Sequence, residues 1–178
     1  MKISSREILL VPFGDVEKEI LLFLKEELGK RFSFSFSLHP PLPFPANSFN
    51  PRRNQYFSSP FIEELHKLKD AFKFLGITEV DLYVRGLNFI FGQAELGGKS
   101  AIISLARLRE EFYGREKNIY QLKLRSLKEA IHELGHTFGL RHCRNFPCVM
   151  TFSNTLMEVD KRSNTFCLSC KLLLDSVV

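Results

Sequence analysis

Three of the five histidines in this 178-residue chain fall within eleven positions, and their spacing restricts the local fold more than any other feature of the sequence. His132 and His136 are four residues apart, so on a helix they project from the same face, one turn apart. Gly139 follows where a helix can end, because glycine adopts the left-handed conformation of a helix terminus without penalty. The chain can then return and bring His142 beside the other two histidines.

The apolar residues of the predicted helix, at about 119–138, indicate which side faces the core. One stripe along the helix is formed by Leu127, Ile131, Leu134 and Phe138. The two histidines of the helix lie on the other side, together with Arg125 and Glu129. We therefore expect the histidines to face either solvent or a cleft.

Three imidazoles that converge in this way are typical ligands of zinc. They would fill three positions of a tetrahedral ion and leave the fourth to water. Glu133 lies about 100° around the helix from His132, which is within reach of that water but poorly placed to ligate. We expect His132, His136 and His142 to bind a catalytic zinc ion and Glu133 to act as the general base that activates the zinc-bound water.

All four cysteines lie close behind the histidines, as Cys143, Cys148, Cys167 and Cys170. So short a C-terminal segment cannot bury enough apolar surface to fold unaided, and a bound metal would hold it together. Four thiolates around a structural zinc ion fit the paired spacing, and two disulfides are the alternative. A third arrangement, in which Cys143 ligates the catalytic metal, is disfavoured because catalytic zinc usually keeps three protein ligands.

The pattern His-Glu-x-x-His-x-x-Gly-x-x-His, followed eight residues later by Met150, resembles the signature of the metzincin peptidases. In metzincins this methionine of the Met-turn packs beneath the histidines, and plain core filling is the alternative for Met150. With its cysteine spacing the chain resembles the archaemetzincin family, over most of its length. The resemblance is densest at residues 130–170, and residues 51–56, 87–92 and 104–108 also contribute to it. It implies one catalytic zinc and a second, four-cysteine structural zinc.

We therefore expect a zinc metallopeptidase that hydrolyses peptide bonds in peptide or protein substrates, with two zinc ions per chain. By the same resemblance, residues 87–91 would form an edge strand above the active site that pairs with an extended peptide, although an ordinary strand with no ligand role is the alternative. A zinc-binding regulatory or binding protein with little peptidase activity is the alternative function, which the intact Glu133 disfavours. A cysteine-zinc module that binds nucleic acid would explain the cysteines but not the histidines.

Alternating strand and helix patterns predict an α/β (α+β) fold with a mixed sheet. Strands are expected at residues 6–13, 32–38, 80–84, 87–91 and 100–105, and helices at 15–28, 58–75, 119–138 and from about 167 onward. We expect a single metallopeptidase domain over residues 1–178, with a metzincin-like twisted sheet and an active-site helix. Its N-terminal subdomain would span residues 1–139, and a short zinc-stapled C-terminal subdomain would span residues 140–178.

The net charge of +5 comes from basic residues that are scattered along the chain, so no basic face for nucleic acid is predicted. The apolar run at residues 8–13 is too short for a signal peptide, and no stretch approaches the ~20 apolar residues of a membrane span. We expect a cytoplasmic monomer with neither nucleic-acid nor membrane partners.

Overall fold

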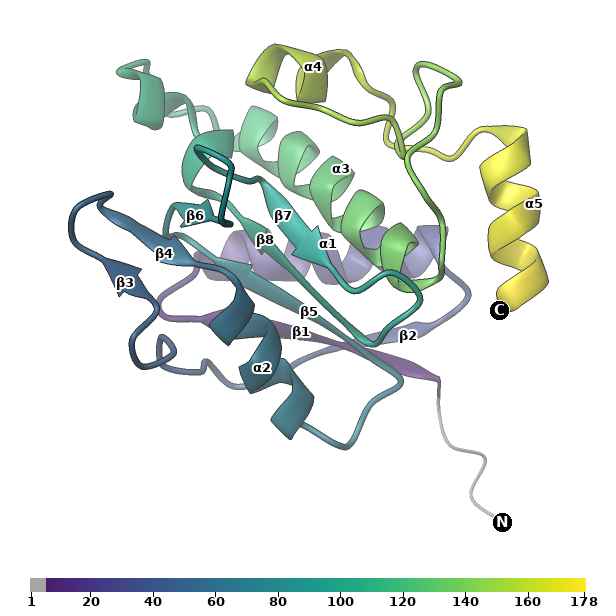
Figure 1. The fold of residues 1–178 in the computed structure, drawn as a ribbon. Coiled ribbons are helices and arrows are strands. Elements are labelled where there is room, and N and C mark those ends of the chain that lie inside the picture. Colours follow the sequence, from purple (N-terminus) through teal and green to yellow (C-terminus); the bar gives the residue numbers. More distant parts are fainter. Residues whose placement is uncertain (1–5) are drawn as a thin grey trace.

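The computed structural model describes residues 6–178, which form a mixed α/β fold around a five-stranded sheet (Figure 1). The strand order is β2-β1-β5-β8-β7, in which the first four strands run parallel and β7 pairs antiparallel with β8 at the edge. The predicted fold class is confirmed. The strands are Glu7–Phe13 (β1), Ser35–Leu38 (β2), Lys73–Thr78 (β5), Gly92–Ala94 (β7) and Ser100–Ser104 (β8).

Helices cover both faces of this sheet (Figure 1). Helices α1 (Lys18–Arg31) and α3 (Ile119–Thr137) pack together on one face, and α2 (Ser59–Lys67) packs on the other. Because both faces are covered, every residue of β5 and β8 is buried. Within residues 6–178, none of the helices has the length and apolar character that crossing a bilayer requires.

A second sheet of three short strands has the order β3-β4-β6, where β3 is Phe49–Asn50, β4 is Gln55–Phe57 and β6 is Leu82–Tyr83. Strand β4 leads directly into α2. Two short 3₁₀ helices, Ala106–Leu108 and Glu110–Tyr113, follow β8 and precede α3.

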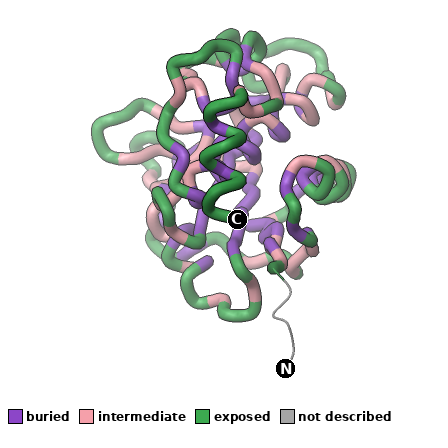
Figure 2. Tube along the Cα trace, turned by 90° about the vertical axis from the view of Figure 1, so that its right-hand side faces the viewer, coloured by how far each residue is buried: buried purple, intermediate pink, exposed green. Residues whose placement is uncertain are grey.

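Beyond α3 the chain runs back over that helix and ends in two short helices, α4 (Leu156–Lys161) and α5 (Leu168–Val177) (Figure 1). Helix α5 lies at the surface, where it buries only Cys170 and Leu174 (Figure 2). Helix α5 therefore contributes few apolar side chains of its own to the core.

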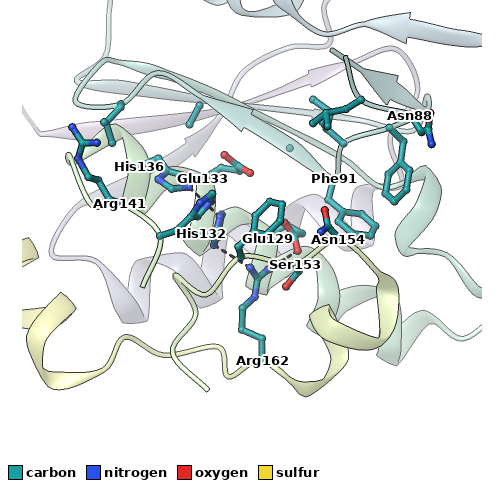
Figure 3. A pocket seen from close by; sticks show the side chains of 18 residues that line it. Asn88, Phe91, Glu129, His132, Glu133, His136, Arg141, Ser153, Asn154 and Arg162 are labelled. Carbon is teal, nitrogen blue, oxygen red and sulfur yellow. Dashed lines mark hydrogen bonds and ion pairs between the residues drawn. The ribbon is translucent and has the colours of Figure 1, made fainter. Parts of the chain in front are cut away.

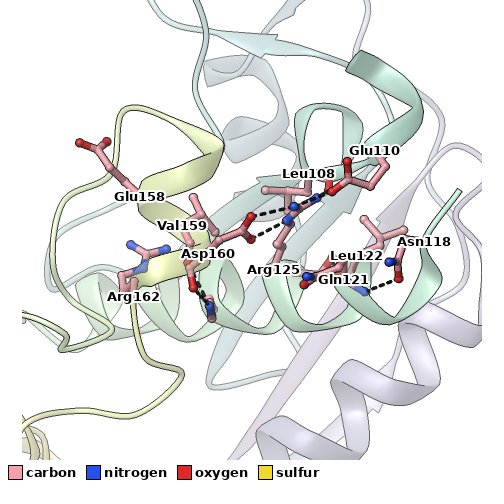
Figure 4. Close-up of polar contacts among 12 residues, drawn as sticks. Leu108, Glu110, Asn118, Gln121, Leu122, Arg125, Glu158, Val159, Asp160 and Arg162 are labelled. Atoms are coloured by element: carbon pink, nitrogen blue, oxygen red, sulfur yellow. Dashed lines mark hydrogen bonds and ion pairs between the residues drawn. The ribbon is translucent and has the colours of Figure 1, made fainter. Parts of the chain in front are cut away.

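Arg125 of α3 is almost fully buried and fixes α4 to the rest of the fold (Figure 4). Its Nε and Nη2 donate to the two carboxylate oxygens of Asp160 at 2.7 and 2.8 Å, and Nη1 donates to the carbonyl of Leu108 at 2.9 Å. Glu110 pairs with the same guanidinium at 2.6 Å, and Lys128 donates to the Asp160 carbonyl at 2.8 Å. Because the guanidinium of Arg125 is paired with two carboxylates, its burial is tolerated.

The region after α2 differs from the prediction. The sequence pattern predicted one helix up to residue 75 with Gly76 as its stop, whereas α2 ends at Lys67 and residues 73–78 form the central strand β5. Gly76 lies in the middle of that strand. A Cβ at this position would lie 3.1 Å from the Phe13 ring and 3.2 Å from the Ile102 side chain, so the glycine allows close packing rather than a helix end.

Helix α1 also has other limits than predicted. It begins at Lys18 rather than just after Asp15, and it continues through Gly29 to Arg31. Glu27 pairs with both Lys30 and Arg31, and these contacts support a last turn beyond the glycine.

The strand predicted at residues 87–91 is absent, and the antiparallel edge strand is β7 at residues 92–94. Only Ile90 makes an isolated bridge, to Leu82. The carbonyls of residues 87 and 88 accept hydrogen bonds from the side chains of Arg53 and Gln55 instead of joining a strand ladder. The Pro-rich loop at residues 39–51 contains the two-residue strand β3, and the strand predicted at 80–84 shortens to β6.

Candidate functional site

The three predicted histidine ligands lie together at the C-terminal end of α3. A ring nitrogen from each of His132, His136 and His142 lies within 4.8 Å of the others, and the Nε2 atoms of His132 and His136 are 3.0 Å apart. Zinc–nitrogen distances of about 2.0–2.1 Å would place two ligands of a tetrahedral ion roughly 3.3 Å apart, which is close to this separation. Gly139, at φ 90°, ends the helix in the left-handed conformation and lets the chain return with His142.

The outer nitrogens of the two helical histidines are fixed by backbone carbonyls. His132 Nδ1 lies 2.8 Å from the carbonyl oxygen of Val149, and His136 Nδ1 lies 2.7 Å from that of Leu140. A carbonyl only accepts, so each Nδ1 carries the proton and each Nε2 presents its lone pair to the cluster. This is the tautomer that a metal needs.

Burial lowers the pKa of all three imidazoles. The pKa of His132 falls well below its usual value of 6.5, first because of burial and then because the Arg162 guanidinium lies nearby. Burial also lowers the pKa of His136 and that of His142. The rings are therefore neutral at pH 7, which is the form that ligates metal ions.

Glu133 lies beside the histidines, beneath the edge strand β7 (Figure 3). It is 6% exposed, and its carboxylate accepts no hydrogen bond from the described residues. Burial raises its pKa well above the usual value, and the nearby carboxylate of Glu129 adds to this shift. The backbone of Gly92 covers it closely, because a Cβ there would come within 2.6 Å of Glu133 Cγ.

Met150 is fully buried under α3 and packs against Gly135. A Cβ on Gly135 would meet the Met150 sulfur at 2.5 Å, so only glycine leaves room for this contact. Gly135 directly precedes His136 in the helix. Met150 therefore fills the core and at the same time contacts the backbone that carries the histidines.

A buried ion pair between Arg162 and Glu129 was missed by the sequence analysis. Arg162 Nη2 contacts Glu129 Oε1 at 2.5 Å (Figure 3). Its Nη1 donates to the carbonyl of Thr151 at 2.8 Å. The same Nη1 lies 3.0 Å from His132 Nδ1. Arg162 thus connects α3 to the loop after Met150 and lies beside the ring of a predicted ligand. It lies thirty residues after His132, so no local pattern could have linked the two.

These residues lie at the floor of a cleft of about 770 Å³. We call residues 87–91, which form one side of it, the cleft wall. The wall is largely apolar, and Arg141 lies at the rim of the cleft. The remaining lining residues are Gly92, Ala94, Leu96, Glu129, His132, Glu133, His136, His142, Phe152, Ser153, Asn154 and Arg162.

The four cysteines form a separate group. The sulfur atoms of Cys143, Cys148, Cys167 and Cys170 all lie within 4.8 Å of one another, and none forms a disulfide. Cys143 Sγ and Cys167 Sγ are 3.8 Å apart, which matches the roughly 3.8 Å between two sulfurs of a tetrahedral zinc site with Zn–S bonds of about 2.3 Å. Cys143 lies with the other thiols rather than with the histidines.

The remaining histidines lie elsewhere. His39 contacts the carbonyl of Pro40, and His66 contacts Glu95 at the surface. Within the stretches that carry the family resemblance, Asn88 lines the cleft, whereas Arg53 and Tyr56 do not.

Comparisons of the sequence and of the structure with known proteins point to the same family. The sequence profile of peptidase family M54 matches residues 45–176. The archaemetzincin of Methanocaldococcus jannaschii is 48% identical over 163 residues, which cover 92% of this chain and 89% of that protein. The archaemetzincin of Pyrococcus furiosus is 44% identical over 171 residues, with coverages of 92% and 89%.

Two solved archaemetzincin structures share the whole fold. The one from Methanopyrus kandleri superposes with a TM-score of 0.87 and 34% identity, covering 99% of this chain and 97% of its own. The one from Archaeoglobus fulgidus, complexed with malonate, gives a TM-score of 0.83 and 35% identity, with coverages of 94% and 99%.

Proposed function

Because this chain belongs to peptidase family M54, the archaemetzincins, and is therefore a zinc metallopeptidase, we propose that His132, His136 and His142 hold its catalytic zinc and that Glu133 is its general base. The observation that supports this best is the convergence of imidazole nitrogens beside a buried carboxylate that has no other partner among the described residues. Two of the rings are fixed by backbone carbonyls in the tautomer that ligation requires.

The roles within the site follow from the position of each group. The zinc ion, when bound, supplies a Lewis acid that polarises the scissile carbonyl and makes water easier to deprotonate at neutral pH. Glu133 takes the proton of the attacking water and delivers it to the leaving amine. Gly92 holds the carboxylate of Glu133 at the floor of the cleft, where a peptide in the cleft would meet it.

We further propose that the four cysteines hold a second, structural zinc ion. All four sulfurs fit a closed tetrahedral site, which leaves no position for a substrate. Such a site supplies folding energy and would hold in place α5, a helix that buries only Cys170 and Leu174. The chain would then be one domain in which residues 140–178 form a metal-dependent subdomain. Met150, packed under Gly135, would support the histidine helix from below.

The test of the general base is Glu133→Gln, which keeps the shape of the side chain and removes its basicity. We expect the variant to keep its zinc and to lose peptide hydrolysis by about 10²-fold or more, which is the usual contribution of a general base. Glu63→Gln, an exposed position on α2, is the matched control and should hydrolyse peptides as the wild type does. Wild-type rates in Glu133→Gln would refute the proposed role.

The same experiment separates the second candidate function. If the wild-type protein binds zinc and peptides but cleaves none of a peptide library, it is a binding protein that retains the site. We also propose that the protein is monomeric, since one chain supplies every residue of both clusters. Light scattering after size exclusion would test this, with a mass near 20.6 kDa expected.

A further inference from the structure

Neighbouring strands hold the cleft wall only at its end, where the Ile90 amide donates to the carbonyl of Leu82 in β6 and the Phe91 carbonyl accepts from the Ser104 amide of β8. Residues 87–91 lie outside every strand, and Leu87 at their start is 52% exposed. The carbonyls of Leu87 and Asn88 are nevertheless fixed, because side chains from the second sheet and its hairpin turn donate to them. At the start of the wall, side chains rather than a strand ladder therefore set its height above the histidines.

Arg53 makes most of these contacts. Its Nη2 donates to the carbonyls of Leu87 and Asn88, at 2.9 Å in each case. Its Nε donates to Gln55 Oε1 at 2.8 Å, and its guanidinium lies 4.2 Å from the centre of the Tyr83 ring. The planar, rigid guanidinium can serve all four partners at once, whereas a lysine ammonium could not.

A second line of contacts fixes the other side of the wall. Gln55 Nε2 donates to the Asn88 carbonyl and to Asp81 Oδ2, at 2.9 Å in each case. Arg107 forms a bidentate salt bridge with Asp81, with both N–O distances at 2.8 Å. Its guanidinium lies 4.2 Å from the centre of the Phe89 ring, which lines the cleft. The three stretches around residues 51–56, 87–92 and 104–108, which share no local pattern, thus meet in one network.

The turn that presents Arg53 is itself unusual. Asn54, the next residue, has φ +52°, and a left-handed backbone is uncommon for residues other than glycine. Asn50 accepts hydrogen bonds from the backbone amides of Arg52 and Arg53 and so closes this turn. Backbone conformations of this kind persist where the surroundings determine them, often near functional sites.

We propose that Arg53 is a positioning residue for the peptide substrate, and this inference rests on the proposed function. By fixing two carbonyls of the cleft wall, Arg53 sets the width of the cleft opposite the histidines without touching substrate or metal. The wall presents the apolar side chains of Leu87, Phe89, Ile90 and Phe91, so the favoured substrate is a peptide with a large apolar side chain next to the scissile bond.

The test compares two hydroxamates on zinc-loaded protein by calorimetry. Acetohydroxamate is small and would contact only the metal site, whereas Pro-Leu-Gly hydroxamate would also lie along the cleft wall. For Arg53→Gln we expect about tenfold weaker binding of Pro-Leu-Gly hydroxamate, with acetohydroxamate unchanged within about twofold. Arg53→Lys should behave like Arg53→Gln, because lysine lacks the planar guanidinium whose fixed N–H donors serve all these partners at once. Arg52→Gln, the exposed neighbour on the same turn, is the matched control and should bind both probes normally.

The outcomes distinguish a failure of the proposed role of Arg53 from a failure of the proposed function. Unchanged binding of Pro-Leu-Gly hydroxamate to Arg53→Gln would overturn the role of Arg53, and so would an equal loss for both probes, since that indicates damage to the metal site. Failure of either probe to bind the wild type would instead refute the proposed function. With a cleaved peptide as substrate, Arg53→Gln should raise KM and leave kcat nearly unchanged.

Discussion

Adding one methyl group at Gly92 would test the placement of Glu133 most sharply. In Gly92→Ala the new Cβ would lie 2.6 Å from Glu133 Cγ, 2.7 Å from Glu133 Oε1 and 2.8 Å from the carbonyl oxygen of Ile102. Carbon atoms in contact are normally about 3.5–4.0 Å apart. The Ile102 carbonyl belongs to the β8 backbone and cannot yield easily, so the carboxylate of Glu133 must move by roughly 1 Å.

The expected effect follows from that displacement. Misplacement of a reacting group by about 1 Å can cost about 10²-fold in rate, which corresponds to about 2.7 kcal/mol in the activation free energy. Overpacking of this kind also lowers the free energy of unfolding by about 1–3 kcal/mol. None of the three atoms nearest to the new Cβ belongs to a histidine, so we expect zinc content to stay at the wild-type level.

The assay measures kcat with a fluorogenic peptide, zinc by elemental mass spectrometry and stability by urea unfolding. Gly29→Ala is the control, because no atom lies within 4 Å of a Cβ at that helical position. In a Glu133→Ala background the stability cost of Gly92→Ala should shrink, since the two clashing Glu133 atoms are gone and only the close approach to the Ile102 carbonyl remains. Wild-type kcat and stability in Gly92→Ala would refute this placement of Glu133 beneath β7.

Three further predictions concern other parts of the molecule. Burial lowers the pKa of Lys73 from 10.5 to about 8, so between these pH values the unfolded chain binds more protons than the folded one and the free energy of unfolding should rise with pH. In urea titrations over this pH range, the wild type should become more stable relative to Lys73→Met. A stability difference between the two proteins that does not change with pH would contradict the lowered pKa. Cys170→Ser should lose one zinc and lower the melting temperature, whereas a stable variant that lacked only activity would move the cysteines to the catalytic site. Met150→Leu should cost less than about 1.5 kcal/mol and keep both metals, because volume and polarity are conserved; a loss as large as that of His136→Ala would show that the sulfur itself matters.

The histidine helix could be predicted because its signals are local. Its apolar stripe repeats over about three turns, Asn118 caps its start and Gly139 allows its end, so the predicted C-terminal limit differs from the observed one by one residue. The convergence of His142 on the helix followed from the same short stretch. Local spacing was also enough to group the four cysteines.

Other features depend on partners that are distant in the chain. The apolar run at residues 73–78 continues the pattern of α2, and only its neighbours β1 and β8 make it a strand. The cleft wall likewise has strand-like composition, but the side chain of Arg53 donates to the carbonyls of Leu87 and Asn88, which therefore join no strand ladder. The polar face of α3 offered no sign that Glu129 would be buried, because its partner Arg162 lies 33 residues away.

Metal content per chain tests the central claim most directly. Elemental mass spectrometry of the native protein should find two zinc ions, and His136→Ala should retain one, because only the histidine cluster loses a ligand. A single zinc ion in the native protein that survives His136→Ala, with no second site filled by added zinc, would contradict a catalytic metal held by His132, His136 and His142.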